Sequence, residues 1–181
     1  TPLGLTVEWI AGKQTARARA TAEARIRSGN AEVVVGTHAL FQEAVRGLAR
    51  GVLVTLDDTP RDLRATLIRF ALAYRRRVLG AQGIAMFRAL VPEVPRFRPL
   101  ARSMYAAGAG QTVRRLAAYL QKAMDAGQLR RDDPELAAEL LMGMLVGQDR
   151  IKRLFGVANG KAGDAQRAER IVDCFLRAYR K

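Results

Sequence analysis

The stretch from Pro134 to Phe155 carries the most pronounced apolar pattern in the chain. Two aspartates precede it, and carboxylates followed by proline are typical of the first turn of a helix. Between positions 136 and 147 the single polar side chain is Glu139. A helix that covers one core needs an apolar stripe on only part of its circumference. The pattern therefore predicts a helix buried on two sides, one in its own core and one against a partner subunit. A central core helix is the alternative.

The periodicity elsewhere divides the chain into two parts. Residues Leu5–Ile10 alternate apolar and polar side chains, and Val33–Val35 is a short apolar run, so each segment predicts a strand. Lys13–Arg27 lies between them and predicts a helix. The three elements together are typical of a parallel βαβ unit. From about Ala39 onward the spacing is helical, and no convincing strand follows.

Proline and glycine separate the helices of the second part. We expect helices over residues 63–79, 82–90, 100–126, 134–155 and 165–179. Gly108 and Gly110 weaken the middle of the 100–126 helix and are expected to kink it. The predicted fold class is mainly α, with a short N-terminal βαβ fragment. The domain boundary falls between residues 1–38 and 39–181.

The charge and the cysteine content limit the classes of protein to which this chain can belong. The net charge is +14, mostly from arginine, which favours attraction to nucleic acid. The arginines are spread along every helix, so a solvated surface explains them equally well. No apolar run approaches the roughly 20 residues of a membrane span and no signal peptide is visible, so we expect a cytoplasmic protein without membrane contact. Cys174 is the single cysteine, and its apolar neighbours predict a buried thiol.

No catalytic or metal-binding pattern emerges from the sequence. One histidine and one cysteine without clustered ligands make a zinc site implausible. Ser28 and Ser103 lack a base within any recognisable motif for nucleophilic catalysis. We therefore expect a protein that is not an enzyme and that uses no cofactor.

The N-terminal part resembles a known motor protein. The stretch PLGLTVEWIAGKQTARARATAEARIRSGNAEVVVGTHALFQE closely resembles RecG-type ATP-dependent DNA helicases, over most of residues 1–43. The resemblance implies that Gly36, Thr37 and His38 lie near a nucleic-acid backbone, with Thr37 and His38 as candidate contacts. An ordinary strand-end residue is the alternative for His38. The phosphate-binding loop GxxxxGKS/T is missing, so ATPase activity is not expected.

The helical part resembles the C-terminal domain of TetR/AcrR-type transcriptional regulators over about residues 39–181. The stretches DLRATLIRFALAYRRRVL, PEVPRFRPLARSMYAAG and LAAYLQKAMDAGQLRRDDPELAAELLMGML carry this resemblance, together with the final helix. It implies a ligand-binding domain whose last two long helices pair with a second subunit. The candidate interface residues are Leu140, Gly143, Met144, Gly147, Phe175 and Leu176. The candidate contacts to a small apolar ligand are Phe70, Tyr74, Met86, Phe87, Tyr105 and Tyr119, and an ordinary core position is the alternative for each.

Three functional interpretations remain open at this point. The first is a TetR-like ligand-binding and homodimerisation module without a recognisable helix-turn-helix, because the helicase-like segment stands where that motif is expected. The second is a helicase-like fragment that binds DNA but does not hydrolyse ATP. The third is a dimeric helical domain without a working function that carries a poorly folded N-terminal segment.

Overall fold

The computed structural model describes residues 7–10, 15–28, 33–36, 38–56, 62–157 and 164–181. The chain divides into two compact units, residues Thr1–Gly47 and Leu48–Lys181. Within the described residues, no helix is long and apolar enough to cross a membrane.

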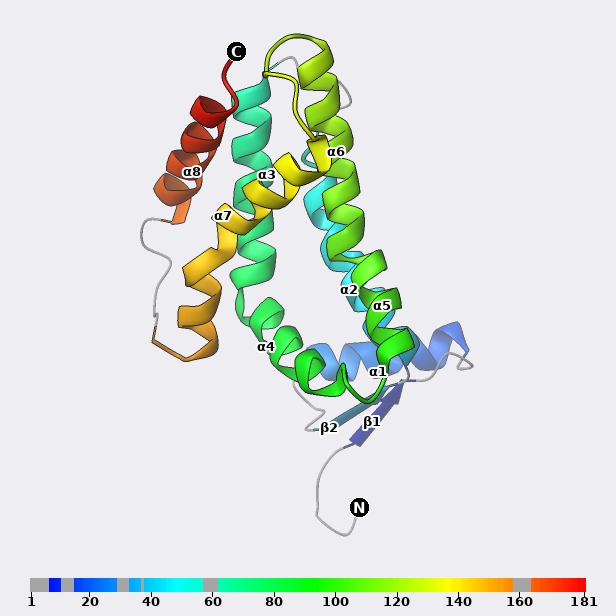
Figure 1. The fold of residues 1–181 in the computed structure, drawn as a ribbon. Helices are drawn as coiled ribbons and strands as arrows, with labels where there is room; N and C mark the ends of the chain where they lie inside the picture. The colour runs from blue at the N-terminus through cyan, green and yellow to red at the C-terminus, as the bar shows by residue number, and fades with distance from the viewer. Residues whose placement is uncertain (1–6, 11–14, 29–32, 37, 57–61, 158–163) are drawn as a thin grey trace. The chain divides into compact units, whose positions relative to one another are not determined.

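The first unit contains a pair of parallel strands connected by a helix (Figure 1). Strand β1 spans Val7–Ile10, helix α1 spans Ala16–Arg27 and strand β2 spans Val33–Gly36. In the parallel register Val7 pairs with Val33 and Ile10 pairs with Gly36. Helix α2 spans His38–Leu53, and its last residues, from Leu48 onward, belong to the second unit.

The second unit is helical, as the fold class of this part predicted. Its elements are α3 (Leu63–Leu79), α4 (Ala81–Leu90), the 3-10 turn η1 (Val91–Glu93), α5 (Arg98–Ala107), α6 (Ala109–Asp125), α7 (Pro134–Leu154) and α8 (Asp164–Ala178). Helix α3 packs against α7 and α8, and α6 packs against α7 (Figure 1). The buried side chains that fill the space between these four helices include Leu67, Phe70, Leu116, Leu120, Leu141, Leu145, Val172 and Phe175.

Short polar residues and glycine set several helix ends. The carboxylate of Asp62 accepts a hydrogen bond from the Ala65 amide at 2.9 Å, and that of Asp133 accepts one from the Glu135 amide at 2.8 Å. Gly127 ends α6 with a φ of 71°, and the amide of Gln128 donates to the carbonyl of Ala123 at 2.9 Å. This left-handed glycine closes a Schellman motif, which any residue with a side chain would strain.

The expected single helix over residues 100–126 is two helices in the structure. Gly108 has φ −108° and ψ −95°, which leaves the helical region, so α5 ends before it and α6 begins after it. The amide and the hydroxyl of Thr112 both donate to the Gly108 carbonyl, at 3.1 and 3.0 Å, so α6 begins with Gly108 as its N-cap residue. The kink was predicted at the correct position, but the structure shows a complete break of the helix there. Glycine adopts a non-helical backbone at little cost, which permits the break.

Arginine side chains join the ends of α3, α4 and α7. Arg153 of α7 donates from Nη1 to the carbonyl of Leu79, the last residue of α3, at 2.8 Å. Arg88 of α4 donates from Nη2 to the carbonyl of Arg153 at 3.0 Å. Each guanidinium donates to a carbonyl in the last turn of a helix, as basic residues near helix C-termini do, and the Arg153 carbonyl also accepts from the Gly156 amide at 3.2 Å.

Candidate functional site

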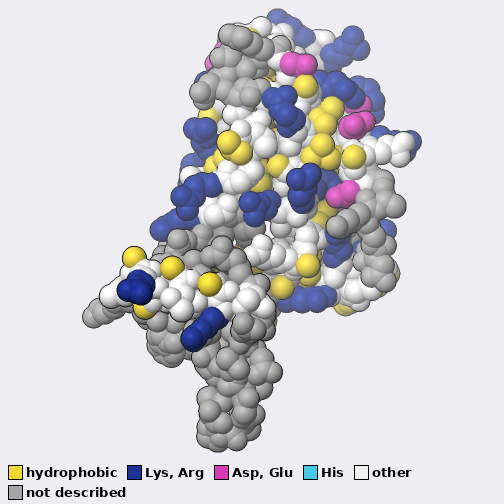
Figure 2. All heavy atoms as spheres, turned by 180° about the vertical axis from the view of Figure 1, so that it is seen from behind, with side chains coloured by type: hydrophobic (Ala, Val, Ile, Leu, Met, Phe, Trp, Pro, Cys, Tyr) yellow, Lys and Arg dark blue, Asp and Glu magenta, His cyan; other side chains and the backbone are white. Residues whose placement is uncertain are grey.

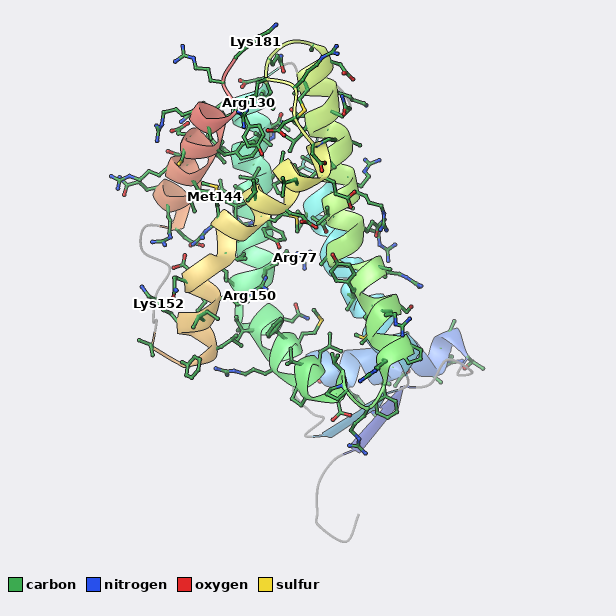
Figure 3. All side chains as sticks on the ribbon, viewed as in Figure 1. Arg77, Arg130, Met144, Arg150, Lys152 and Lys181 are labelled. Atoms are coloured by element: carbon green, nitrogen blue, oxygen red, sulfur yellow. The ribbon has the colours of Figure 1, made fainter. Side chains whose placement is uncertain are left out.

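Helix α7 has a buried face and an apolar face that its own chain leaves open. Leu141 and Leu145 are fully buried in the core, together with Ala137. On the outer side Leu136 and Leu140 are each 48% exposed and Met144 is 40% exposed. These three residues follow one another at intervals of four, so they form a single stripe along the helix, and Figure 3 labels Met144 on it. We call Leu136, Leu140 and Met144 the outer stripe of α7.

Two glycines flank the outer stripe. Outside the backbone of α7 itself, a Cβ atom built on Gly143 or on Gly147 would meet no atom of the described residues within 4 Å. Neither glycine is therefore needed for packing inside this chain. The absence of side chains at both positions leaves the helix backbone open to close approach by another element.

The two predicted interface residues on α8 lie deeper than the sequence indicated. Phe175 is only 1% exposed and belongs to the chain's own core, where its ring stacks on Tyr179 with centroids 4.6 Å apart. Leu176 is half-buried and packs against the same core. The α7 candidates Leu140, Gly143, Met144 and Gly147 are thus the accessible ones.

The prediction of a buried Cys174 is wrong, because the thiol is exposed. Helix α8 buries Ala168, Val172 and Phe175 on one side. Cys174 follows Val172 by two positions, which places it on the opposite side of the helix. The apolar run around the cysteine is therefore longer than the stripe that the helix buries.

The backbone of α7 is kinked at Gly147, where φ is 11° and ψ is −119°. Arg75 of α3 lies at this kink and donates from Nη1 to the carbonyl of Leu145. The same guanidinium donates to Asp149 at 2.8 Å and to Asp164. The side chain thereby connects α3, the segment of α7 beyond the kink, and the first residue of α8.

The Arg75 side chain is only 2% exposed. Burial by itself lowers the pKa of Arg75, but the hydrogen bonds that its guanidinium donates to Asp164 and Asp149 outweigh burial, and the net shift is upward. Arg167 contacts the same Asp149 at 3.0 Å. The sequence held one signal that could have found this residue, since Arg75 follows the buried Ala71 at helical spacing.

The six candidate ligand contacts fall into two groups. Phe70, Tyr74 and Tyr119 belong to the core, and the rings of Phe70 and Tyr74 stack with centroids 5.7 Å apart. Met86 is half-buried, Phe87 is exposed, and Tyr105 is 59% exposed. The structure therefore does not place all six around one interior space.

Arg150 lies close to two of these candidates, Tyr74 and Phe87. Its guanidinium lies 5.3 Å from the centroid of the Phe87 ring, which is cation–π distance. Burial raises the pKa of Tyr74, and Arg150 acts on it in the opposite direction, which places the two side chains close together. The Nε atom of Arg150 is buried without a hydrogen-bond partner among the described residues. Figure 3 shows Arg150 on α7, and sequence reasoning did not single it out.

The two candidate nucleic-acid contacts, Thr37 and His38, are not among the side chains that the structure describes. Thr37 lies outside the described residues, and His38 begins α2 with a side chain that lies outside them as well. Figure 2 shows lysine and arginine distributed over one face rather than gathered in one block. In the part of the chain that the structure describes, no group of three His, Cys, Asp or Glu side chains could hold a metal ion.

The helical part of the chain is similar to known transcriptional regulators. Residues 65–181 match the model of the AefR-like transcriptional repressor, C-terminal domain. A TetR-family transcriptional regulator from Mesorhizobium loti is similar in fold, with a TM-score of 0.68 and 21% identity over 93% of this chain and 87% of that one. The flavonoid-responsive regulator FrrA is similar with a TM-score of 0.66 and 26% identity, over 91% of this chain and 84% of that one.

A shorter similarity concerns DNA helicases. The ATP-dependent DNA helicase RecG of Escherichia coli strain K12 is 48% identical over 62 residues, and that of Pasteurella multocida is 46% identical over 59. The matched segment makes up 33% of this chain but only 8% of either helicase. The chain therefore shares a small part of the helicase and spans little of its length.

Proposed function

The chain belongs to the AefR-like transcriptional repressors, of which it carries the C-terminal domain. From this family we propose that the chain is part of a transcriptional regulator. In this proposal the domain forms a homodimer through α7 and responds to a small apolar or aromatic ligand. Its role is regulatory and not enzymatic.

The outer stripe of α7 is the observation that carries the dimer proposal. Three aliphatic side chains stand half-exposed in one row, beside two glycines with open space around them. Fully burying a leucine or methionine side chain contributes about 1.5–3 kcal/mol, so covering the row with a second copy of α7 gives a substantial driving force. A second copy also suits the row because a self-complementary surface satisfies twofold symmetry.

The test is the solution mass by light scattering, at micromolar protein concentration, for the wild type and for Gly143→Arg. We expect a dimer for the wild type and a folded monomer for the variant. The protomer tolerates the new side chain because nothing lies within 4 Å of the Gly143 Cβ position.

The matched control is Ala118→Arg, which adds the same side chain at an exposed position of α6. This control should remain a dimer. A wild-type monomer, or a Gly143→Arg variant that is as dimeric as the control, would contradict the proposed interface.

The proposed ligand site is the neighbourhood of Tyr74, Phe87 and Arg150. Ligand sites combine apolar walls with a few polar groups that fix orientation. The Arg150 guanidinium over the Phe87 ring, with the Tyr74 hydroxyl near it, meets this description. One structurally similar protein is named a flavonoid-responsive regulator, and aromatic ligands are therefore the first class to test. We expect a flavonoid panel to raise the Tm of the wild type and to lose this effect in Arg150→Met. The proposed class is wrong if no member of the panel changes the Tm.

The helicase similarity supports a second candidate, a segment that binds DNA. Its test is the affinity for a short duplex as a function of salt, with Thr37→Ala and His38→Ala compared against Arg17→Gln. Specific helicase-like contacts predict that the first two substitutions weaken binding. If only Arg17→Gln weakens it, general positive charge is the cause.

A further inference from the structure

A groove with a volume of about 380 Å³ lies in the second unit, where the end of α2 and the end of α3 meet the start of α4. Its lining residues are Gly51, Ala73, Arg76, Arg77, Gly80, Ala81 and Gln82. We propose that this groove binds a compact organic anion, whose carboxylate or phosphate group is held by Arg76 and Arg77. The proposal is independent of the dimer and of the ligand site at Arg150.

The position of Arg77 depends on a glycine opposite to it. A Cβ atom on Gly51 would lie 2.5 Å from Nη2 of Arg77 and 3.1 Å from its Cζ and Nε atoms. The guanidinium therefore lies directly on the backbone of α2, in space that any larger residue would occupy. Figure 3 labels Arg77 on α3. This contact orients a planar group with several donors at the wall of the groove.

The polar side chains of the groove have no partner among the residues that the structure describes. Among the described residues, neither Arg76, Arg77 nor Gln82 forms an ion pair or a side-chain hydrogen bond, whereas Arg64, Arg75 and Arg167 all pair with aspartates. None of the described residues that line the groove is an aspartate or a glutamate. The dipole of α3 favours arginines near its C-terminus. It does not explain why Arg76, Arg77 and the side-chain amide of Gln82 line the same groove.

The dimensions and the lining select the class of ligand. A volume of this size fits a small molecule, and the remaining walls are alanine and glycine, which leave room for a short apolar body. A guanidinium binds carboxylate and phosphate with two parallel hydrogen bonds, and two adjacent guanidinium groups favour an anion over its neutral analogue. A nucleic-acid backbone would instead suit a protruding row of basic side chains.

The experiment uses nitrogen-15 NMR of the full chain with benzoate as the probe, at physiological ionic strength. Benzamide is the neutral control, phenyl phosphate tests the second anionic group, and a short DNA duplex tests the nucleic-acid backbone. We expect benzoate to shift the amides of Gly80–Gln82 and the Nε resonances of Arg76 and Arg77, and benzamide not to. The ratio of the benzoate and phenyl phosphate affinities identifies the preferred anion.

Three variants decide whether the groove is the site. Arg77→Gln should weaken benzoate binding about tenfold or more, because it removes a charge-assisted contact. Gly51→Ala should weaken it while keeping the net charge, since the new methyl group displaces the guanidinium, which is the flexible end of a side chain. Arg131→Gln, an exposed position outside the groove, should leave it unchanged.

Four results would overturn the proposal. The first is the lack of benzoate-induced shifts at Gly80–Gln82, and the second is equally tight binding of benzamide. The third is an Arg131→Gln variant that weakens benzoate as much as Arg77→Gln does, which would attribute the effect to net charge. The fourth is displacement of benzoate from these amides by the DNA duplex at a lower concentration than phenyl phosphate.

Discussion

Arg75 and Asp149 are joined by a hydrogen bond of 2.8 Å between Nη2 and Oδ2, although 74 positions separate them in the chain. The bond spans the kink of α7, because Asp149 lies just beyond Gly147 and Arg75 also holds the carbonyl of Leu145 before it. Asp164 at the start of α8 completes the set of acceptors. One buried side chain thus fixes the direction of α7 after the kink and anchors α8 to α3.

Substitution of Arg75 by leucine should destabilise the protein strongly. The variant removes the donor that the Leu145 carbonyl, Asp149 and Asp164 share, and Asp149 keeps only its contact with Arg167. Breaking a buried ion pair costs about 3–5 kcal/mol. Urea unfolding followed by circular dichroism measures the change in free energy.

Arg64→Leu is the control for this substitution, because Arg64 forms a bidentate pair with Asp173 on the surface. Solvent screens an exposed pair, so its loss should cost much less stability than the loss of the buried Arg75 contacts. Equal losses in the two variants would show that the burial of Arg75 has no energetic consequence.

Stability at alkaline pH should depend on Tyr74. Burial raises the pKa of Tyr74, with Arg150 opposing it, so the folded state holds this proton above the pH at which an unfolded tyrosine releases it. The stabilisation is complete below about pH 10, the ordinary tyrosine value, and is lost as the pH rises through the higher folded value. Urea unfolding at increasing pH should show a steeper loss for the wild type than for Tyr74→Phe. Parallel curves would contradict the assignment.

The sequence predicts best where a local pattern has one physical outcome. The aspartates at positions 62 and 133 cap helices, Gly127 ends α6, and the apolar circumference of α7 divides into a core face and an open face. Each follows from residues that are neighbours in the chain or along a helix.

The features that the sequence missed depend on contacts between distant segments. Arg75 belongs to a run of three arginines, and only the acceptors at positions 145, 149 and 164 distinguish it from the exposed Arg76 and Arg77. The exposure of Cys174 likewise depends on which face of α8 meets α3. Pairing of this kind leaves no periodic signal in the sequence.

Alanine at Gly83 should disrupt the contact between α3 and α4. A Cβ atom there would lie 2.2 Å from the carbonyl oxygen of Arg77 and 2.7 Å from that of Val78. Both are backbone atoms at the end of α3 and cannot rotate away, so the start of α4 must move. We expect a loss of about 2–3 kcal/mol in the free energy of unfolding, at the upper end of overpacking effects.

Gly47→Ala is the matched control for Gly83→Ala, since its Cβ position in α2 meets no described atom within 4 Å apart from the helix's own backbone. Alanine in an open helix interior should be neutral or stabilise by up to about 1 kcal/mol. Similar losses in both variants would mean that glycine is needed at position 83 for a reason other than this clash.

The thiol of Cys174 should react in the folded protein. It is exposed on the side of α8 opposite to Val172, and it is the single cysteine of the chain, so a thiol reagent reports on this position alone. The measurement is the rate of reaction with a chromogenic disulfide without denaturant, in the Gly143→Arg variant, where a second subunit does not cover the helix. We expect one thiol per chain to react at a rate close to that of the urea-unfolded protein. Reaction only on unfolding would contradict this prediction and place Cys174 in the core. Helix α8 would then have to be rotated about its axis, and Val172 and Phe175 would no longer occupy their positions against α3.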